Sequence, residues 1–194
     1  TIEGNKIFSR FELVAAIREN VRKNQKNLDR LIIEKIIGQV YKKHSFLETI
    51  IHANEQKYSD KFQKKISHYF VSVKESEKAK VKKISFSGNN LFTEKEIMKV
   101  FHTSASDLAT RFYVDEEYFD SFSDILKNEY LGKGYVQVDV SRPLLSKHGK
   151  FYHLEYKINE LDQTVIDKIE FNGVTTETAL ALKEILTNKE KQPF

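Results

Sequence analysis

Three stretches of the chain share the same order of hydrophobic and polar positions. In each one, a short run rich in β-branched and aromatic residues ends at a glycine, and a Ser or Thr that can start a helix follows. The glycines stand at positions 4, 88 and 173, so the pattern recurs after 84 and then 85 residues. This recurrence predicts a tandem repeat. The three stretches are Ile2–Ser9, Ile84–Thr93 and Ile169–Thr176.

The glycine of each stretch is expected at the turn where the chain leaves the strand. Glycine adopts positive φ without steric cost, so it suits such a turn. An Asn follows the glycine in the first two copies. A second pair of glycines is expected to end a later helix of copy two. The residues assigned to these structural positions are Gly4, Asn5, Gly88, Asn89, Gly173, Gly132 and Gly134.

Two helices are predicted after each of the first two turns. Ser9-x-x-Glu12 and Thr93-x-x-Glu96 have the spacing of a capping box. The third copy offers Thr175 or Thr176 as a cap, but no glutamate follows three residues later. Apolar residues at helical spacing mark the buried faces. The helices are expected over residues 9–27, over a segment ending at 42–44, from 93 to just beyond 101, and from 115–117 to 131.

Each complete copy is expected to end in two strands. In copy two, Tyr152, Leu154, Tyr156 and Ile158 alternate with other residues, which predicts a strand with one buried face. The two strands of copy two are expected over about 135–145 and 151–159, and those of copy one over about 46–53 and 65–74.

The repeating unit is therefore β-α-α-β-β, an α+β fold in which two helices cover one face of a three-stranded sheet. We predict a first unit over residues 1–77, with a truncated first strand and a long first helix. A complete unit follows over residues 78–160, and residues 161–194 start a third unit. Because the chain starts with Thr1 and stops inside a repeat, we expect its function to belong to a longer chain.

Composition supports a folded protein and removes several kinds of chemistry. Of the 194 residues, 40% are hydrophobic and 31% charged, which is typical of globular proteins. The absence of cysteine excludes disulfides and thiolate-bound zinc. No apolar run approaches the ~18 residues of a membrane-spanning helix. The net charge of +4 comes from lysines scattered among acids, which predicts a solvated surface and no nucleic-acid site.

No catalytic, metal or cofactor site is predicted. His148 and His153 flank a turn, but no third ligand completes a metal-binding spacing. Three adjacent acids at 115–117 are typical of a helix start, where they favour the helix dipole. Gly132-x-Gly134 lacks the third glycine of a dinucleotide-binding loop. We therefore predict that the chain is not an enzyme and binds no cofactor.

The combined pattern resembles the polypeptide-transport-associated (POTRA) family. The resemblance rests on the strand that ends in Gly88-Asn89, the capped helix after it, and the run from Leu131 to Tyr135. It is strongest over residues 78–175, with Val81–Phe92 and Asn128–Val140 as its most specific stretches, and looser over 1–77. Tandem copies at this spacing resemble the arm of a BamA-like outer-membrane assembly factor.

The resemblance implies a location and partners. Such arms lie in the periplasm of Gram-negative bacteria, precede an outer-membrane β-barrel, bind unfolded outer-membrane proteins and dock accessory lipoproteins. It also implies the strand order 1-3-2, which leaves strand two at an edge where a partner strand can add.

The edge strand expected in copy two is made of Tyr135, Val136, Gln137, Val138, Asp139 and Val140. We expect the valines to face the core and the other three side chains to be exposed. Pro143 is expected to end or protect this edge. We predict that Val138→Pro weakens partner pairing because proline removes a main-chain donor.

The sequence also leaves other functions open. The same repeats could form the arm of a two-partner secretion transporter or part of a cell-division protein. A small α+β sheet could also bind RNA. The edge strand could be purely structural and covered by a neighbour.

Overall fold

The computed structural model describes residues 1–24, 28–59, 61–186 and 189–193. Their contacts divide the chain into two compact units. Unit 1 contains Thr1–Lys80 together with Asp107–Glu116, and unit 2 contains Val81–Ser106 together with Glu117–Phe194.

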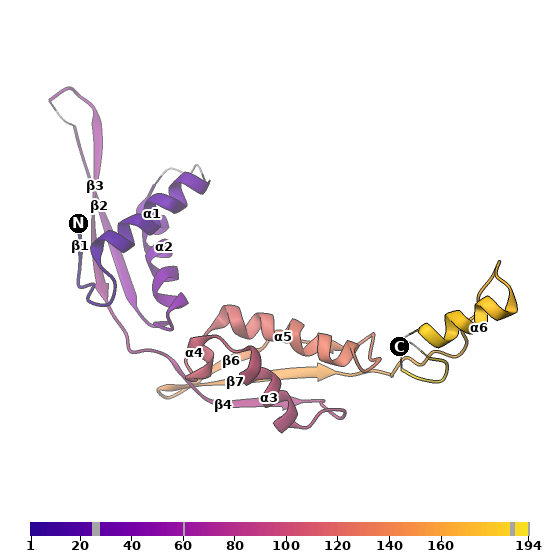
Figure 1. Ribbon diagram of the computed structural model, residues 1–194. Coiled ribbons are helices and arrows are strands. Elements are labelled where there is room, and N and C mark those ends of the chain that lie inside the picture. Colours follow the sequence, from indigo (N-terminus) through magenta and orange to yellow (C-terminus); the bar gives the residue numbers. More distant parts are fainter. Residues whose placement is uncertain (25–27, 60, 187–188, 194) are drawn as a thin grey trace. The chain divides into compact units, whose positions relative to one another are not determined.

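Unit 1 is a three-stranded sheet with two helices. Strand β3 lies between β1, which is parallel to it, and β2, which is antiparallel. The β2–β3 register runs without a bulge from the pair Ile50–Lys74 to the pair Ser59–Lys65. Figure 1 shows α1 and α2 beside the sheet and the β2–β3 hairpin reaching beyond them. The elements are β1 (Ile2–Glu3), α1 (Arg10–Asn24), α2 (Arg30–Lys43), β2 (Ile50–Ser59), β3 (Lys65–Lys74) and α4 (Asp107–Thr110).

The core of unit 1 forms where the helices meet the base of the hairpin. Leu13 of α1, Ile37 and Tyr41 of α2 and Ala53 of β2 are completely buried. Both helices begin with side-chain caps: Glu12 N–H donates to the Ser9 hydroxyl, and Ile32 N–H donates to the Asp29 carboxylate. The expected capping box of the first copy is therefore confirmed, since Ser9 N–H also donates to Glu12.

The segment Asp107–Glu116 packs on the first repeat, although its position in sequence is inside the second. Val114 N–H donates to the Ala79 carbonyl over 2.9 Å, and the Ser45 hydroxyl donates to the Val114 carbonyl over 2.7 Å. The Lys78 ammonium lies 5.1 Å from the centre of the Tyr113 ring. Periodicity cannot place this segment, because the contacts that hold it come from distant residues.

Unit 2 repeats the same architecture. Strand β7 lies between β4 and an edge made of β5 and β6. Helix α5 buries an aromatic stripe that includes Phe119, Phe122 and Tyr130. The second capping box is also present, between Thr93 and Glu96. The elements are β4 (Lys80–Ser87), α3 (Glu94–Ser104), α5 (Glu116–Leu131), β5 (Asp139–Val140), β6 (Leu144–His148), β7 (Phe151–Asn159) and α6 (Thr176–Ile185).

The α+β class and the strand order 1-3-2 are confirmed in both units. Two expectations about strands are wrong. The second strand of copy one starts at Ile50, not at residue 46, because Ser45 has positive φ and Phe46 N–H still bonds to the Tyr41 carbonyl at the end of α2. Residues 165–171 form no strand: Val165 makes an isolated bridge with Pro193, and Ile166 exchanges main-chain hydrogen bonds with Lys191 and Gln192. In units 1 and 2 the first strand pairs with the last strand of its own unit, and no such strand is described after β7.

The expected first helix over residues 9–27 is described only to Asn24, and residues 25–27 lie outside the described part of the chain. The division into units at 77/78 and 160/161 stays a prediction. In the described part of the chain, no helix combines the length and the apolar character that crossing a membrane requires.

Candidate functional site: the strand edges

Strand β2 of unit 1 offers a long unpaired edge. It pairs with β3 on one side along all ten residues, and no described strand pairs with its other side. Alternate residues of an antiparallel strand turn their N–H and C=O groups to opposite sides. The direction is set by Ala53, whose N–H points away from β3 to the Glu34 carboxylate. The residues whose main-chain N–H and C=O groups point away from β3 are therefore Ile51, Ala53, Glu55, Lys57 and Ser59.

Helix α2 lines this edge near its base. Glu34 Oε1 accepts from Ala53 N–H over 2.7 Å and lies 3.6 Å from His52 Nδ1. A side chain at Gly38 would contact the Ile51 side chain at 3.6 Å, so a larger residue would fill the groove between helix and strand. The groove has a volume of about 370 Å³ and is lined by Glu34, Lys35, Gly38, Gln39, Lys42, Thr49 and Ile51.

The edge predicted in unit 2 has different bounds from those expected. Residues 135–138 form no strand; Val138 N–H closes a turn onto the Tyr135 carbonyl. Of the six residues of the predicted edge, only Asp139 and Val140 pair with β7, opposite Asn159 and Ile158. Residues 134–138 form the exit from α5 and are therefore not free to start a strand. Gly134 has φ 82°, and Tyr135 N–H donates to the Tyr130 carbonyl. The observed edge is therefore β5 followed, after residues 141–143, by β6.

Two further details of the predicted edge are wrong. Val138 is buried as expected, but Val136 is 37% exposed in the turn, so the three valines do not share a core-facing strand face. Pro143 lies between β5 and β6 and does not end the edge, which continues to His148. Val138→Pro would therefore break a turn and not remove a donor from a free edge. Partner binding by Tyr135, Val136, Gln137, Val138, Asp139 and Val140 stays a prediction.

The glycine–asparagine pairs hold the turn after the first strand in both units. Gly4 has φ 83°, and a Cβ there would lie 2.1 Å from the Val73 carbonyl oxygen. Gly88 has φ 82°, and its Cβ would lie 2.0 Å from the Ile158 carbonyl oxygen. The amides of Asn5 and Asn89 each donate to a carbonyl three residues later, over 2.9 Å. These residues therefore hold the fold at this turn.

The remaining glycines of the pattern are less constrained. Gly173 has φ 80°, but apart from its two chain neighbours no atom of the described residues lies within 4 Å of a Cβ built on it. Gly132 donates to the Asn128 carbonyl at the end of α5, and Gly134 follows with positive φ.

A tyrosine–glutamate pair fastens the same turn in both units, and the sequence patterns do not predict it. In unit 1 the Tyr41 hydroxyl donates to Glu75 Oε1 over 2.7 Å, and the N–H groups of Lys6 and Ile7 donate to the same oxygen over 2.8 Å. In unit 2 the Tyr130 hydroxyl and Leu91 N–H both donate to Glu160 Oε1 over 2.8 Å. One signal is present in the sequence, because Glu75 and Glu160 have the same separation as the second and third glycines of the repeat.

The pKa directions of Glu75, Tyr41 and Tyr130 are those expected of hydrogen-bonded structural contacts. Burial acts to raise the pKa of Glu75, but hydrogen bonds from Ile7, Tyr41 and Lys6 outweigh it, so the pKa is lowered. Burial, and then the neighbouring carboxylate, raise the pKa of Tyr41 and of Tyr130. The Glu75 carboxylate is therefore held ionised beside the neutral Tyr41 phenol, and this pair is not arranged for proton transfer at neutral pH.

The histidines flanking the β6–β7 turn do meet in space. The rings of His148 and His153 stack with centroids 4.1 Å apart. Partial burial first, and then His148, Lys83 and Lys82, lower the pKa of His153. Within the described ranges, no group of three or more His, Cys, Asp or Glu could hold a metal ion.

Comparison with known proteins supports the sequence pattern. Residues 79–161 match the family model of POTRA, described as "Surface antigen variable number repeat". Among curated proteins, none matches the chain.

Three of the similar solved structures cover most of the chain. BamA POTRA3-5 of Haemophilus influenzae is 12% identical, with 100% of this chain and 77% of that chain covered and a TM-score of 0.47. The N-terminal domain of Omp85 from Thermosynechococcus elongatus is 10% identical, with 100% of this chain and 77% of that chain covered and a TM-score of 0.47. POTRA1-2 of the periplasmic domain of Omp85 from Anabaena is 14% identical, with 82% of this chain and 89% of that chain covered and a TM-score of 0.44.

The strand order, the helix placement and the family match point to the same fold. The segment that matches contains the complete second repeat. Unit 1 has the same strand order, the same glycine turn and the same tyrosine–glutamate contact. The chain thus carries a POTRA domain over residues 79–161, preceded by a unit of the same fold.

Proposed function

We propose that the chain is a periplasmic receptor and scaffold arm of an outer-membrane β-barrel assembly factor. Its partners are unfolded outer-membrane proteins and accessory lipoproteins, which add a strand to its sheet edges. The POTRA match over residues 79–161 supports the class of protein. The observation that carries the binding mode is the ten-residue edge of β2.

The chemistry of this edge suits many clients. Main-chain hydrogen bonds recognise an extended chain without reading its sequence, so one edge can accept different β-strands. The outward groups of Glu55, Lys57 and Ser59 lie beyond the part of the edge that Glu34 occupies. We infer that a client strand pairs first with this outer half.

The test compares two variants at Lys57, whose N–H points outward. Lys57→Pro removes this donor and leaves the β2–β3 hydrogen bonds in place, because the neighbouring residues make them. Lys57→Gln is the matched control, since it loses the same charge and keeps the donor. The probe is a urea-unfolded outer-membrane β-barrel protein, diluted into buffer and titrated with the 194-residue chain.

We expect Lys57→Pro to weaken binding about three- to tenfold, the size of one lost hydrogen bond, while Lys57→Gln stays close to the parent chain. Equal binding by both variants, with unchanged circular dichroism, would reject pairing at this edge. Equal loss in both would show that the lysine charge matters and not the strand edge.

A further inference from the structure

The outer half of the β2–β3 hairpin extends beyond the helices of unit 1. Figure 1 shows it projecting past α1 and α2. Near the point where the hairpin leaves the helices, the Tyr69 hydroxyl donates to the Leu28 carbonyl. Beyond it, every described residue from 56 to 65 is exposed, although β2 and β3 stay paired as far as Ser59 and Lys65. An isolated two-stranded ribbon with no core of its own is marginally stable, so its length calls for a role outside the fold.

One face of this ribbon carries aromatic and apolar side chains, with Gln56 opposite His68 and Asn54 opposite Phe70 among them. Strand alternation places on it the side chains opposite the core-facing Ala53 and Val71. Tyr58 and Ile66 form a cross-strand pair there, and the rings of His68 and Phe70 stack with centroids 4.5 Å apart. Tyr58 is 51% exposed and Phe70 39% exposed. At the turn that joins the strands, Phe62 is 77% exposed.

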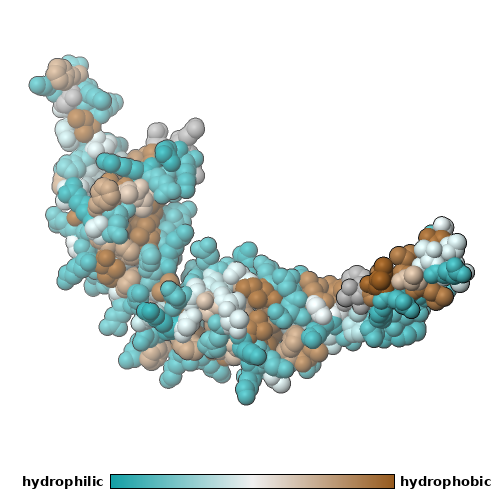
Figure 2. Space-filling view, in the orientation of Figure 1, coloured by the Kyte–Doolittle hydropathy of each residue, from teal (hydrophilic) through white to brown (hydrophobic). Residues whose placement is uncertain are grey.

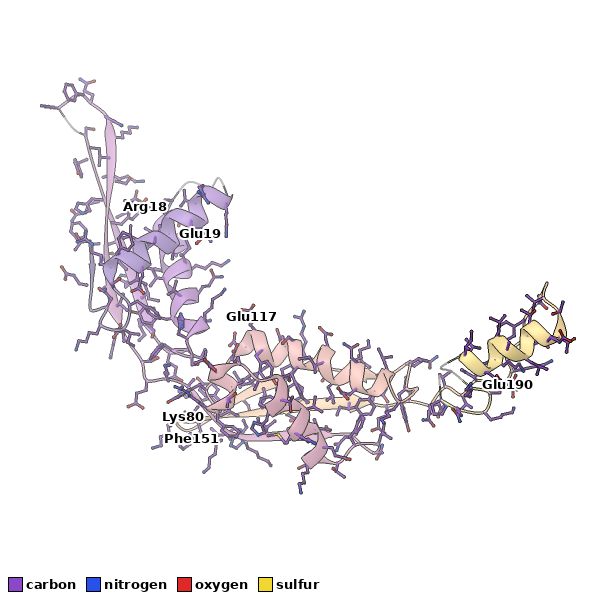
Figure 3. All side chains as sticks on the ribbon, in the orientation of Figure 1. Arg18, Glu19, Lys80, Glu117, Phe151 and Glu190 are labelled. Atoms are coloured by element: carbon purple, nitrogen blue, oxygen red, sulfur yellow. The ribbon has the colours of Figure 1, made fainter. Side chains whose placement is uncertain are left out.

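Lysines surround this aromatic face. Lys57 and Lys65 lie on the opposite face, where the Lys57 ammonium is 3.4 Å from the Glu55 carboxylate, and Lys61 and Lys64 lie in the turn. The Lys61 ammonium lies 5.1 Å from the centre of the Phe62 ring. From residue 57 to residue 65 the sequence has four lysines and one acid. Figure 2 shows hydrophobic colour among hydrophilic side chains at this tip, and Figure 3 shows the sticks standing away from the ribbon on both sides.

We propose that the outer half of the β2–β3 hairpin docks on the surface of an anionic phospholipid membrane. Aromatic side chains partition into the interface between headgroups and acyl chains. Lysines bury their methylene stems along apolar surface and keep the ammonium groups at the level of the lipid phosphates. The tip of the ribbon can therefore enter such a surface, with Phe62 in the interface and Lys61 and Lys64 at the level of the phosphates.

The charge of the ribbon favours a membrane over a polypeptide on this face. A polypeptide that pairs with the β2 edge is held by main-chain groups and needs neither the aromatic face nor the lysines. An anionic bilayer uses both, because it offers an apolar layer beneath a plane of negative charge. This proposal does not depend on the proposed function, since it uses the face of the hairpin and not its edge.

A tryptophan reporter tests the contact directly, because the chain has no tryptophan. Phe62→Trp places one at the tip, and Leu144→Trp, at a residue 59% exposed on β6 of unit 2, is the control. The probe is a vesicle of phosphatidylcholine with one third phosphatidylglycerol, compared with phosphatidylcholine alone. We expect the indole fluorescence of Phe62→Trp to shift to the blue only with anionic vesicles, and that of Leu144→Trp to stay unchanged.

Charge variants measure the electrostatic part by co-sedimentation with the same vesicles. Lys61→Glu combined with Lys64→Glu is expected to lower binding at least tenfold, since each lysine near an anionic surface contributes about fivefold. Lys95→Glu combined with Lys99→Glu makes the same charge change on exposed positions of α3 and is expected to alter binding less than twofold.

Two results would overturn the proposal. In the first, the fluorescence of Phe62→Trp does not respond to anionic vesicles, in which case the ribbon serves a protein partner. In the second, the α3 variant loses as much binding as the hairpin variant, so that the vesicles respond to overall charge. If Lys57→Pro binds clients as well as the parent chain while Phe62→Trp still shifts with anionic vesicles, the proposed function fails at this edge and the membrane proposal stands.

Discussion

The first and second units share one turn and differ in their edge strands. Both hold the chain after the first strand with a glycine of positive φ, an asparagine and a tyrosine–glutamate contact. The second strand, however, is continuous over ten residues in unit 1 and divided into two and five residues in unit 2. The turn is therefore common to both units of this fold, whereas the length and continuity of the edge strand differ between them.

The largest expected effect concerns the glycine of the shared turn. Gly88→Ala forces a side chain at positive φ to within 2.0 Å of the Ile158 carbonyl oxygen, so the free energy of unfolding of unit 2 should fall by about 3 kcal/mol. Gly149→Ala is the control in the same unit: it also has positive φ, but no atom lies within 4 Å, and the expected loss is about 1 kcal/mol. Urea unfolding followed by circular dichroism measures both, and equal losses would contradict the role of the close contact.

The tyrosine–glutamate contact should matter more in unit 2 than in unit 1. Tyr130→Phe removes a phenol donor from the Glu160 carboxylate, which is 8% exposed and also accepts from Leu91 N–H, and we expect a loss of about 2 kcal/mol. Tyr41→Phe leaves Glu75 with two N–H donors, so about 1 kcal/mol is expected. Amide hydrogen exchange measures each unit separately. A larger loss in unit 1 would show that the number of remaining donors does not decide the cost.

Acid should weaken the turn of unit 1 through Glu75. Its pKa in the folded chain is lowered, so its contribution to stability is complete above the unfolded value of 4.5 and is lost as the pH falls through the lower folded value. We expect Glu75→Gln to be less stable than the parent chain at neutral pH and the difference to shrink on acidification. A difference in unfolding free energy that stays constant over the titration would disprove the linkage.

The smallest expected effect separates the third copy from the first two. Thr175 caps α6, but its partner three residues later is Thr178 and not a glutamate. Thr178→Glu should complete a capping box and stabilise the helix by about 0.5 kcal/mol. Hydrogen exchange of the first turn of α6 measures this change, with Thr178→Gln as a neutral control that can form the same box. Slower exchange in neither variant would show that the cap is already saturated.

How far the sequence predicts the structure depends on the range of the contacts involved. The sequence identifies Ser9 and Thr93 as caps because their partners lie three residues away. It predicts the edge of unit 2 too early in the chain, because Val136 and Val138 alternate like a strand, while Gly134 and the bond from Tyr135 to the Tyr130 carbonyl keep the chain in a turn. Periodicity records side chains and does not show main-chain hydrogen bonds.

The sequence by itself determined the repeat, the α+β unit, the capped helix starts at Ser9 and Thr93 and the glycine turns, because each depends on residues close together in the chain. Only the tertiary structure decided which edge is long and open, that Glu34 closes part of it, that residues 107–116 pack on unit 1, and that Tyr41 and Tyr130 meet Glu75 and Glu160. Each of these depends on groups brought together from distant positions, and on main-chain directions that no local pattern carries.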